Sequence, residues 1–334
     1  MKEQNIPIPV SYGLNTILCA AFLAAGNHIL KSGLVNRAQS SVILQIGIFI
    51  ILAVSLNVST GYLGQLPLGH AGFMAVGGYA AAIFWRSGLL PQGTTHMILG
   101  LVVAGVVSAI FGIIIGIPAL RLRGDYLAII TLGFGEIIRV AIINLSDLTG
   151  GTPGLKNIPK YASFSLVYIC VILTCMAIYL LMKSRHGRAI LSIRENEIAA
   201  EACGVKTTYY KVLAFAVSAF FAGIAGALYA ANQGILVPSA FDFMMSINIL
   251  VIVVLGGMGS MTGSIVAAAV ITSLPLALQS FNRYRMIVYP ILLVIVMIYR
   301  PRGLMGTYEF SLSRVLGRLF GGKAKVERTG GGER

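Results

Sequence analysis

The hydrophobic pattern of the chain consists of long uncharged stretches separated by short charged segments. An uncharged helix of ~20 residues is about as long as the hydrocarbon core of a bilayer is thick. The pattern therefore predicts an all-α, polytopic membrane protein of about ten transmembrane helices. For residues 243–282, which carry no charge, two tight spans and a re-entrant pair both fit the pattern. The predicted spans lie at roughly residues 12–30, 40–56, 66–84, 97–117, 126–145, 164–182, 212–231, 243–257, 262–281 and 286–299.

The charged segment at residues 183–211 sets the orientation of these spans. It holds six Lys or Arg residues and three Glu residues. Because cytoplasmic loops carry an excess of Lys and Arg, we expect this segment to be cytoplasmic. The predicted cytoplasmic segments then hold 17 of the 25 Lys and Arg residues and the outer segments hold seven, with Arg139 inside a span. Both termini are predicted to be cytoplasmic.

The composition leaves little room for a soluble domain. Hydrophobic residues make up 57% of the chain and charged residues 11%, which is typical of a polytopic membrane protein. We expect one transmembrane domain over residues 1–310 and a basic cytoplasmic tail over residues 311–334. The net charge of +14 is explained by the Lys and Arg residues that orient the spans. We therefore predict no nucleic-acid partner.

The tail contains a short amphipathic pattern. Its apolar positions share one helical face, and Arg314 and Arg318 lie opposite them. Such a helix lies in the membrane interface, where its basic residues meet the headgroups of the inner leaflet. Membrane lipid is therefore a predicted partner of this segment, through Leu312, Val315, Leu316, Leu319 and Phe320.

The chain carries no motif for chemistry of its own. It has no G-x-x-x-x-G-K-[ST] sequence, so we expect no ATP site of the P-loop type. The Gly257-Met258-Gly259 sequence lacks the third glycine and the acidic residue of a dinucleotide site. The four His residues are scattered, without carboxylates at metal-ligand spacing. The sequence therefore predicts a protein that is not an enzyme and has no metal site.

Two glycine-rich stretches interrupt the predicted spans, at residues 59–82 and 255–264. Broken helices in a transporter often mark the pathway of the substrate. Small residues also allow helices to pack closely, and both interpretations stay open here. The candidate pathway breaks are Gly61, Gly64, Gly69, Gly256, Gly257 and Gly259.

Two charges fall inside the predicted span at 126–145. Glu136 and Arg139 are three residues apart, so they are neighbours on one helical face. A lone charge at mid-span costs ~2.5–3.5 kcal/mol, and it persists only when it is paired or faces water. The two residues are candidates for an intramembrane gate, or for an ion pair that fixes the position of the helix.

The centre of the charged segment predicts a short helix over residues 194–203. Glu195 and Glu197 lie in its first turn, where acidic side chains interact favourably with the helix dipole. Gly204 is placed to end the helix. Glu197 and Glu201 are four residues apart on one face and repel each other. Either this face is solvated, or a basic partner binds to it.

Several stretches of the chain resemble the permeases of the branched-chain amino-acid ATP-binding cassette (ABC) importers, of the LivM type. The resemblance implies the fold of the type II importer permeases and a bacterial cytoplasmic membrane. It also implies a second permease subunit, two cytoplasmic ABC ATPases that bind ATP and Mg²⁺, an extracytoplasmic substrate-binding protein, and Leu, Ile or Val as substrate. No cofactor is then expected in this chain itself. The stretches are RLRGDYLAIITLGFGEIIR (121–139), LTGGTPGL (148–155), SRHGRAILSIRENEIAAEACGV (184–205), LGGMGSMTGS (255–264) and RPRGLMG (300–306).

Within that resemblance, residues 194–204 correspond to the helix that import permeases insert into a groove of the ATPase. The general pattern E-A-A-x-x-x-G is matched by Ala199, Ala200 and Gly204, whereas Ile198 stands at the position of the glutamate. The residues expected to couple the permease to an ATPase are Arg194, Glu195, Glu197, Ile198, Ala199, Ala200, Glu201 and Gly204.

Three other functions remain as alternatives. A related permease could carry urea or short amides, because a separate binding protein sets most of the selectivity. A secondary transporter driven by an ion gradient would need acidic residues at mid-span, and Glu136 is the one that qualifies. A structural or assembly factor would leave the charged segment without a role.

Overall fold

The computed structural model describes residues 36–88, 91, 93–122, 124–277, 299 and 303, all of which belong to one structural unit, residues 33–309. These residues form helices, and their one β-feature is an isolated bridge between Leu155 and Leu236. The prediction of an all-α, polytopic membrane protein is confirmed. Predicted span 12–30, all of span 286–299 except Tyr299, and the tail at 311–334 lie outside the described residues.

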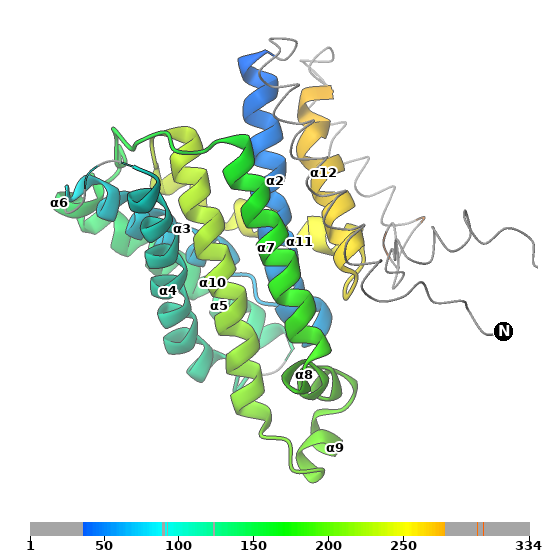
Figure 1. The fold of residues 1–334 in the computed structure, drawn as a ribbon. Helices are drawn as coiled ribbons and strands as arrows, with labels where there is room; N and C mark the ends of the chain where they lie inside the picture. Colours follow the sequence, from blue (N-terminus) through cyan, green and yellow to red (C-terminus); the bar gives the residue numbers. More distant parts are fainter. Residues whose placement is uncertain are drawn as a thin grey trace, which may run out of the picture. The chain divides into compact units, whose positions relative to one another are not determined.

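Five helices of the described part are long and apolar enough to cross a membrane. Each of them coincides with a predicted span, so hydrophobic length alone located them. Figure 1 shows how they run beside one another. They are α2 (Arg37–Asn57, continued by the π-helical turn η1, Val58–Tyr62), α4 (Thr94–Ala119), α5 (Asp125–Asn144), α7 (Phe164–Lys183) and α10 (Thr207–Gln233).

Two further predicted spans form short helices, and the one predicted at 243–257 ends only one residue early. Helix α3 (His70–Arg86) begins four residues after the predicted start at 66, because Pro67 and the glycines beside it leave residues 63–69 non-helical. Helix α11 (Phe243–Gly256) has 14 residues. At 1.5 Å per residue it rises only ~21 Å, less than the ~30 Å of the hydrocarbon core.

Helix α12 (Met261–Ala277) follows α11 after a tight turn, and the two helices pack against each other and against α2. A short 3₁₀ turn, η2 (Pro238–Phe241), leads into α11, and both Leu236 and Phe241 are buried. The chain therefore returns into the bundle before α11 begins. Of the two arrangements open for residues 243–282, this geometry favours the re-entrant one for α11.

Helix α10 is the centre of the bundle and packs against α2, α3 and α4. Glycines make these contacts close: a Cβ atom at Gly77 would overlap the backbone of Gly223, and one at Gly78 would lie 3.0 Å from the carbonyl oxygen of Gly226. In a membrane, helix association depends on such van der Waals contact, because lipid is as apolar as the side chains. The small residues thus hold α3 against α10.

Hydroxyl groups cross-link the buried helices. Ser218 donates to the carbonyl oxygen of Ser55 at 2.8 Å, and Ser55 Oγ is hydrogen-bonded to His70 Nε2 at 3.0 Å. Ser108 donates to the carbonyl oxygen of Phe73 at 3.0 Å. Buried polar groups need such partners, since an unpaired group away from water is costly. These bonds fix the start of α3 beside the lower half of α2.

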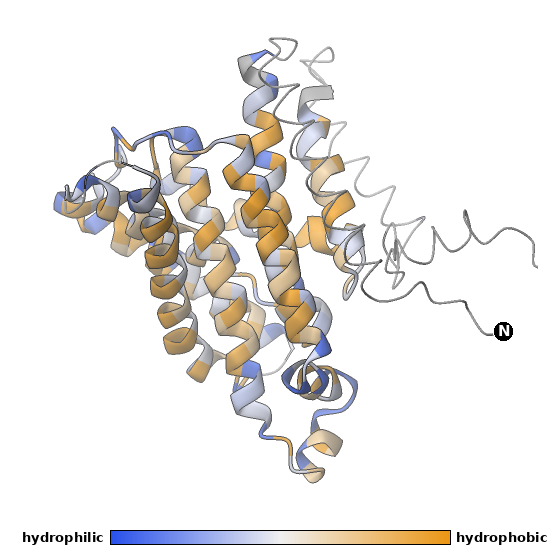
Figure 2. Cartoon of the chain, in the orientation of Figure 1, coloured by the Kyte–Doolittle hydropathy of each residue, from blue (hydrophilic) through white to orange (hydrophobic). Residues whose placement is uncertain are grey.

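Large apolar side chains cover the outward faces of α4, α5 and α7, and α4 and α7 are mostly orange in Figure 2. Ile114 of α4, Ile129 of α5 and Leu173 of α7 are each at least 58% exposed in the chain by itself. A surface of this kind suits lipid or another membrane subunit. The charged ends of the helices are blue in the same view.

Candidate functional site

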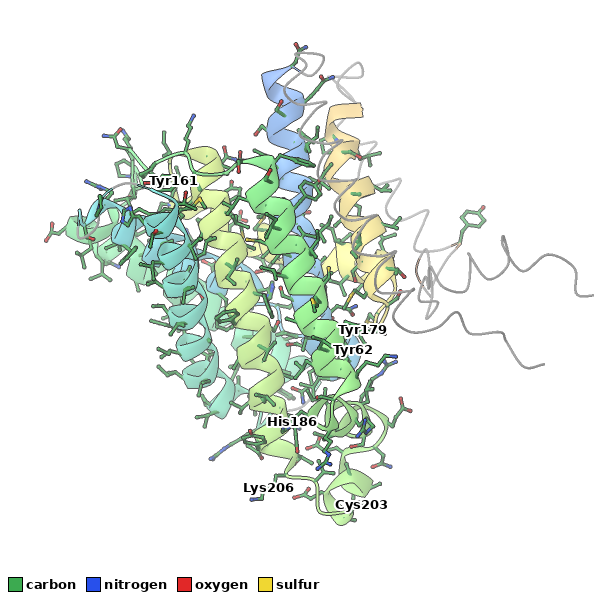
Figure 3. All side chains as sticks on the ribbon, viewed as in Figure 1. Tyr62, Tyr161, Tyr179, His186, Cys203 and Lys206 are labelled. Carbon is green, nitrogen blue, oxygen red and sulfur yellow. The ribbon has the colours of Figure 1, made fainter. Side chains whose placement is uncertain are left out.

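The charged segment, residues 183–211, folds into two short helices between the ends of α7 and α10 (Figure 1). Helix α8 (Arg185–Glu195) starts after Ser184, whose hydroxyl accepts a hydrogen bond from the Gly187 amide. Helix α9 (Glu197–Ala202) follows after a single residue. Figure 3 shows His186, Cys203 and Lys206 at this end of the bundle and Tyr161 at the opposite end.

The prediction of one helix over residues 194–203 is wrong. Arg194 and Glu195 are the last two residues of α8, and Asn196 separates them from α9 in an extended conformation. The Asn196 side-chain oxygen accepts a hydrogen bond from the Ala199 amide at 3.1 Å. Asparagine is a strong N-cap because this bond satisfies one of the free amides of the first turn. The cap residue therefore starts a new helix.

Gly204 ends α9 as predicted. Its φ angle is +84°, and its amide donates to the carbonyl oxygen of Glu201 at 2.9 Å. The next amide, of Val205, donates to the carbonyl oxygen of Ala200 at 3.0 Å. This pair of bonds is the Schellman motif, which needs a left-handed residue after the helix and hence favours glycine.

Glu197 has a basic partner within the chain. Its carboxylate accepts a hydrogen bond of 2.7 Å from Nζ of Lys211, in the second turn of α10. The Lys211 side chain is only 4% exposed, so the pair anchors α9 to α10. The hypothesis that Glu197 and Glu201 both await a basic partner is therefore wrong for Glu197. No local pattern of residues indicates this pairing.

The outer surface of α9 is left open. Ile198 is 71% exposed, whereas Ala200 is buried against the rest of the chain. Ala199 and Glu201 are exposed beside Ile198. An open pocket of about 430 Å³ adjoins this surface, lined by Ala189, residues 203–206, Tyr209 and Tyr210. An exposed isoleucine on a capped, anchored helix is a surface suited to a protein partner.

The two glycine-rich stretches break helices and meet each other. We call residues 58–69, between α2 and α3, the first break, and residues 257–260, between α11 and α12, the second break. The side chain of Asn57, which is fully buried, accepts a hydrogen bond from the Gly259 amide at 2.9 Å. Its nitrogen donates to the carbonyl oxygen of Ser260 at 3.0 Å and to Ser264 Oγ at 3.2 Å. All of these bonds join segments about 200 residues apart.

Arg194 joins the charged segment to both breaks. Its Nη1 atom donates to the carbonyl oxygen of Gly61 at 2.7 Å. A Cβ atom at Gly259 would lie 3.0 Å from the same nitrogen, and one at Gly64 would lie 3.1 Å from Arg194 Cγ. Of the other candidate glycines, Gly69 packs against the Thr131 backbone and Gly256 against Gly263. Gly257 is the left-handed residue that ends α11.

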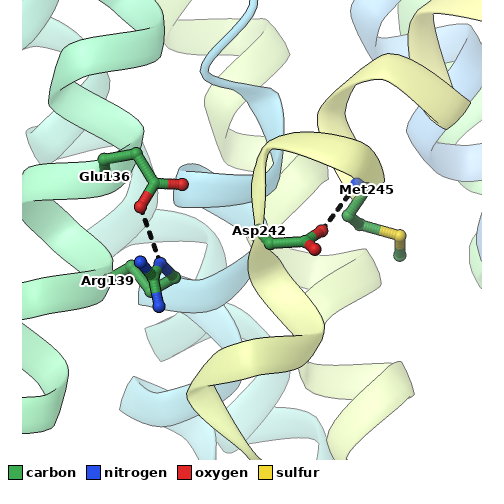
Figure 4. Close-up of polar contacts among 4 residues, drawn as sticks. All are labelled: Glu136, Arg139, Asp242 and Met245. Atoms are coloured by element: carbon green, nitrogen blue, oxygen red, sulfur yellow. Dashed lines mark hydrogen bonds and ion pairs between the residues drawn. The ribbon is translucent and has the colours of Figure 1, made fainter.

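The intramembrane pair forms as the spacing predicts. Nε of Arg139 donates to Glu136 Oε2 at 2.7 Å, and the two side chains are 30% and 35% exposed. Helix α5 lies beside η2 and the start of α11, where Asp242 caps α11 by accepting from the Met245 amide at 2.9 Å. Figure 4 shows the pair on the side of α5 turned towards Asp242.

No group of three or more His, Cys, Asp or Glu side chains that could hold a metal ion occurs in the part of the chain that the structure describes. Several polar residues of that part are engaged in helix caps, in cross-links between helices and at the two breaks.

Comparison with known proteins assigns the chain to a family. The family described as the permease component of the branched-chain amino acid transport system matches residues 39–297. The LivM permease protein of the high-affinity branched-chain amino acid transport system of Salmonella typhimurium is 37% identical, over 88% of this chain and 75% of its own length.

More distant relatives include both permease types. A probable LivM permease protein of Methanocaldococcus jannaschii is 24% identical, over 80% of this chain and 92% of its own. The LivH permease protein of Escherichia coli is also 24% identical, over 78% of this chain and 92% of its own. No solved structure matches the chain.

The pair of Glu197 and Lys211 generates the first prediction. Glu197→Ala leaves a buried ammonium group without its partner, which we expect to cost about 1–3 kcal/mol and to loosen α9. Hydrogen exchange of the α9 amides should become faster in this variant. The double variant Glu197→Ala with Lys211→Met should recover protection, because no charge is stranded. Glu201→Ala, on the exposed side of the same helix, is the control; if it loosens α9 as much as Glu197→Ala does, the ion pair is not the anchor.

The pair in α5 generates the second prediction. Glu136→Ala strands Arg139 in the span, at a cost of ~2.5–3.5 kcal/mol on insertion scales, so this variant should accumulate less in the membrane and melt at a lower temperature. The double variant with Arg139→Ala should restore both readouts, since a neutral helix remains. Leucine uptake by the double variant then separates two roles: restored stability without uptake identifies a gate. Losses of stability that simply add would show that the two residues do not interact.

Proposed function

The chain belongs to the family of permease components of branched-chain amino acid transport systems, and on this basis we propose that it carries leucine, isoleucine or valine inward as one subunit of an ABC importer. It is a multi-pass membrane protein. The relatives of both permease types support a transport role. The observation that carries the proposal is the exposed surface of α9, held on a rigid base at one end of the bundle.

We assign the docking of an ATPase to that surface. Helix α9 begins at a cap, ends at a Schellman turn and is anchored by Lys211, so its position relative to α10 is fixed. Its open side presents Ile198 and Glu201. A partner groove that buries the isoleucine gains apolar area, and a basic group in it would offset the charge of Glu201. Because Lys and Arg are in excess in the segments at this end, we expect it and both termini to be cytoplasmic.

The remaining parts of the importer are assigned to other chains. Two ATPases would bind ATP and Mg²⁺, a second permease of the LivH type would complete the pathway, and a binding protein would deliver the amino acid from outside. Transport would proceed by alternating access in a bacterial cytoplasmic membrane. Urea or short amides remain the alternative substrates, because selectivity would lie mainly in the binding protein.

Reconstitution tests the proposal directly. We expect vesicles that contain both permeases and both ATPases, with ATP enclosed and the binding protein outside, to accumulate radiolabelled leucine. Vesicles with this chain alone should accumulate none under a proton or sodium gradient. Uptake by the lone chain would contradict the ABC assignment. Uptake that unlabelled urea suppresses but valine does not would contradict the branched-chain amino-acid substrate.

Docking through α9 is tested in the same complex. Glu201→Lys should leave membrane insertion intact but weaken co-purification of the ATPases by about tenfold or more, the effect of losing one charge contact at an interface. Gly204→Val should act similarly, because a β-branched residue resists the left-handed conformation of the helix end. Gly204→Asn is the matched control, since asparagine tolerates that conformation. Normal co-purification and normal substrate-stimulated ATP hydrolysis in both variants would refute the docking assignment.

A further inference from the structure

Arg194 is placed differently from the other arginine of α8 whose side-chain contact is described. Arg188 stays on its own segment, where its Nη1 atom donates to the carbonyl oxygen of Lys183 at 3.2 Å. Arg194, one turn and a half further on, reaches across to η1 and binds the carbonyl oxygen of Gly61 at 2.7 Å. The residue as a whole remains exposed. The geometry thus distinguishes a surface arginine from one that bridges two parts of the fold.

The carbonyl oxygen of Gly61 needs an external donor. It belongs to the last residues of the π-helical turn Val58–Tyr62, where the helix ends and the carbonyl groups lose their partners in the next turn. A cation at this negative end of a helix is favoured by the dipole as well as by the hydrogen bond. The guanidinium group of Arg194 satisfies both conditions.

The second break closes on the same point. Asn57 holds the Gly259 amide and the Ser260 carbonyl group from within the bundle, while Arg194 Nη1 covers Gly259 from the cytoplasmic side. Gly259 has a φ angle of +87°, and a Cβ atom at Gly61 would overlap both Asn57 and Gly259. The two breaks are therefore held against each other between the buried side-chain amide of Asn57 and the guanidinium group of Arg194. We call this arrangement the clasp.

One polar atom beside the clasp has no partner. The Ser59 hydroxyl lies in η1, is only 1% exposed, and has no hydrogen bond within the described residues. A buried hydroxyl without a partner is unfavourable. A second arrangement of η1, in which water or another segment reaches Ser59, would satisfy this hydroxyl. π-Helical turns are frequent at sites that change conformation.

We propose that Arg194 is the positioning residue that transmits movement of the charged segment to the two helix breaks, and that the clasp is the inner closure of the permease. This deepens the proposed function and rests on it. Helix α9 is tied to α10 by Lys211, and α8 is tied to the breaks by Arg194, with Asn196 alone between the two helices. When a docked ATPase shifts α9, α8 shifts with it, and Arg194 either keeps or releases Gly61.

The proposal assigns Arg194 a role different from that of Ile198 and Glu201. Those two residues form the surface for the ATPase, whereas Arg194 acts inward. Its loss should leave docking intact and disconnect ATP hydrolysis from the movement of η1. The probe for that movement is Ser59→Cys in a chain whose four native cysteines are replaced by serine.

The experiment uses the complete complex in vesicles and a membrane-impermeant thiol reagent on the cytoplasmic side. With Arg194 present, labelling of Cys at position 59 should change on addition of ATP. With Arg194→Ala, we expect unchanged co-purification of the ATPases, labelling that no longer responds to ATP, and stimulation of ATP hydrolysis by the loaded binding protein about tenfold lower, the scale of one charge-assisted hydrogen bond. Arg188→Ala, the matched loss of one arginine from α8, should behave as the unchanged complex does.

Arg194→Lys keeps the charge and the stem but presents a point donor in place of a planar fork. It should retain part of the ATP response, and it replaces Arg194→Ala if that variant does not accumulate in the membrane. Wild-type labelling and stimulation in Arg194→Ala would overturn the proposal, and so would loss of the ATPases from the complex. Equal effects of Arg188→Ala and Arg194→Ala would overturn it as well. The labelling needs no substrate, so an incorrect substrate assignment fails in the uptake assay and leaves this readout unaffected.

Discussion

Every backbone amide and carbonyl group in the hydrocarbon core of a bilayer must find a partner inside the protein, and this requirement governs the structure around the two helix breaks. A continuous helix meets it without help. A helix that stops within the bundle leaves groups unpaired at its end. At the first break the carbonyl oxygen of Gly61 is paired with Arg194, and at the second break the Gly259 amide and Ser260 carbonyl group are paired with Asn57. These two side chains thus supply partners for backbone groups that the broken helices leave unpaired.

The same requirement explains why few polar side chains hold the helices together. Elsewhere in the bundle, contact between helices depends on glycines such as Gly77 and Gly223, which let backbones approach and leave no polar group to satisfy. Serine hydroxyls add single bonds between helices that are already in contact. Two oppositely charged pairs are described, Glu136 with Arg139 on α5 and Glu197 with Lys211 between α9 and α10. Each charge is thereby compensated locally, as its surroundings demand.

Sequence alone predicted those features that depend on neighbours along the chain. Hydrophobic length located the five long helices, spacing paired Glu136 with Arg139, and Gly204 marked the end of α9. The glycine-rich stretches were recognised as breaks, although their role in the pathway stays a prediction. Each of these features follows from hydrophobic periodicity, or from a residue type whose effect extends over one or two helical turns.

The contacts that sequence missed join distant positions. Lys211 lies 14 residues from Glu197, and Gly259 lies 202 residues from Asn57. An asparagine at the end of an apolar run signals a polar partner but does not say which one. The start of α9 was missed for a different reason, because Asn196 is a modest helix residue in the interior and a strong cap at the end. The cap bond from the Ala199 amide to Asn196 and the tertiary contact of Lys211 with Glu197 both favour the second role.

That contact also explains why a two-helix segment suits transmission better than the single helix expected from sequence. One continuous helix over residues 194–203 would turn Arg194 and Ile198 together, since residues four apart share a face. With Asn196 extended between them, α8 and α9 have separate axes and separate anchors. Movement of Ile198 then reaches Arg194 through the hinge residue Asn196. The hydrogen bond from Lys211 to Glu197 sets the direction of that movement. The ion pair that removed Glu197 from the docking surface is thus what gives the remaining surface a fixed base.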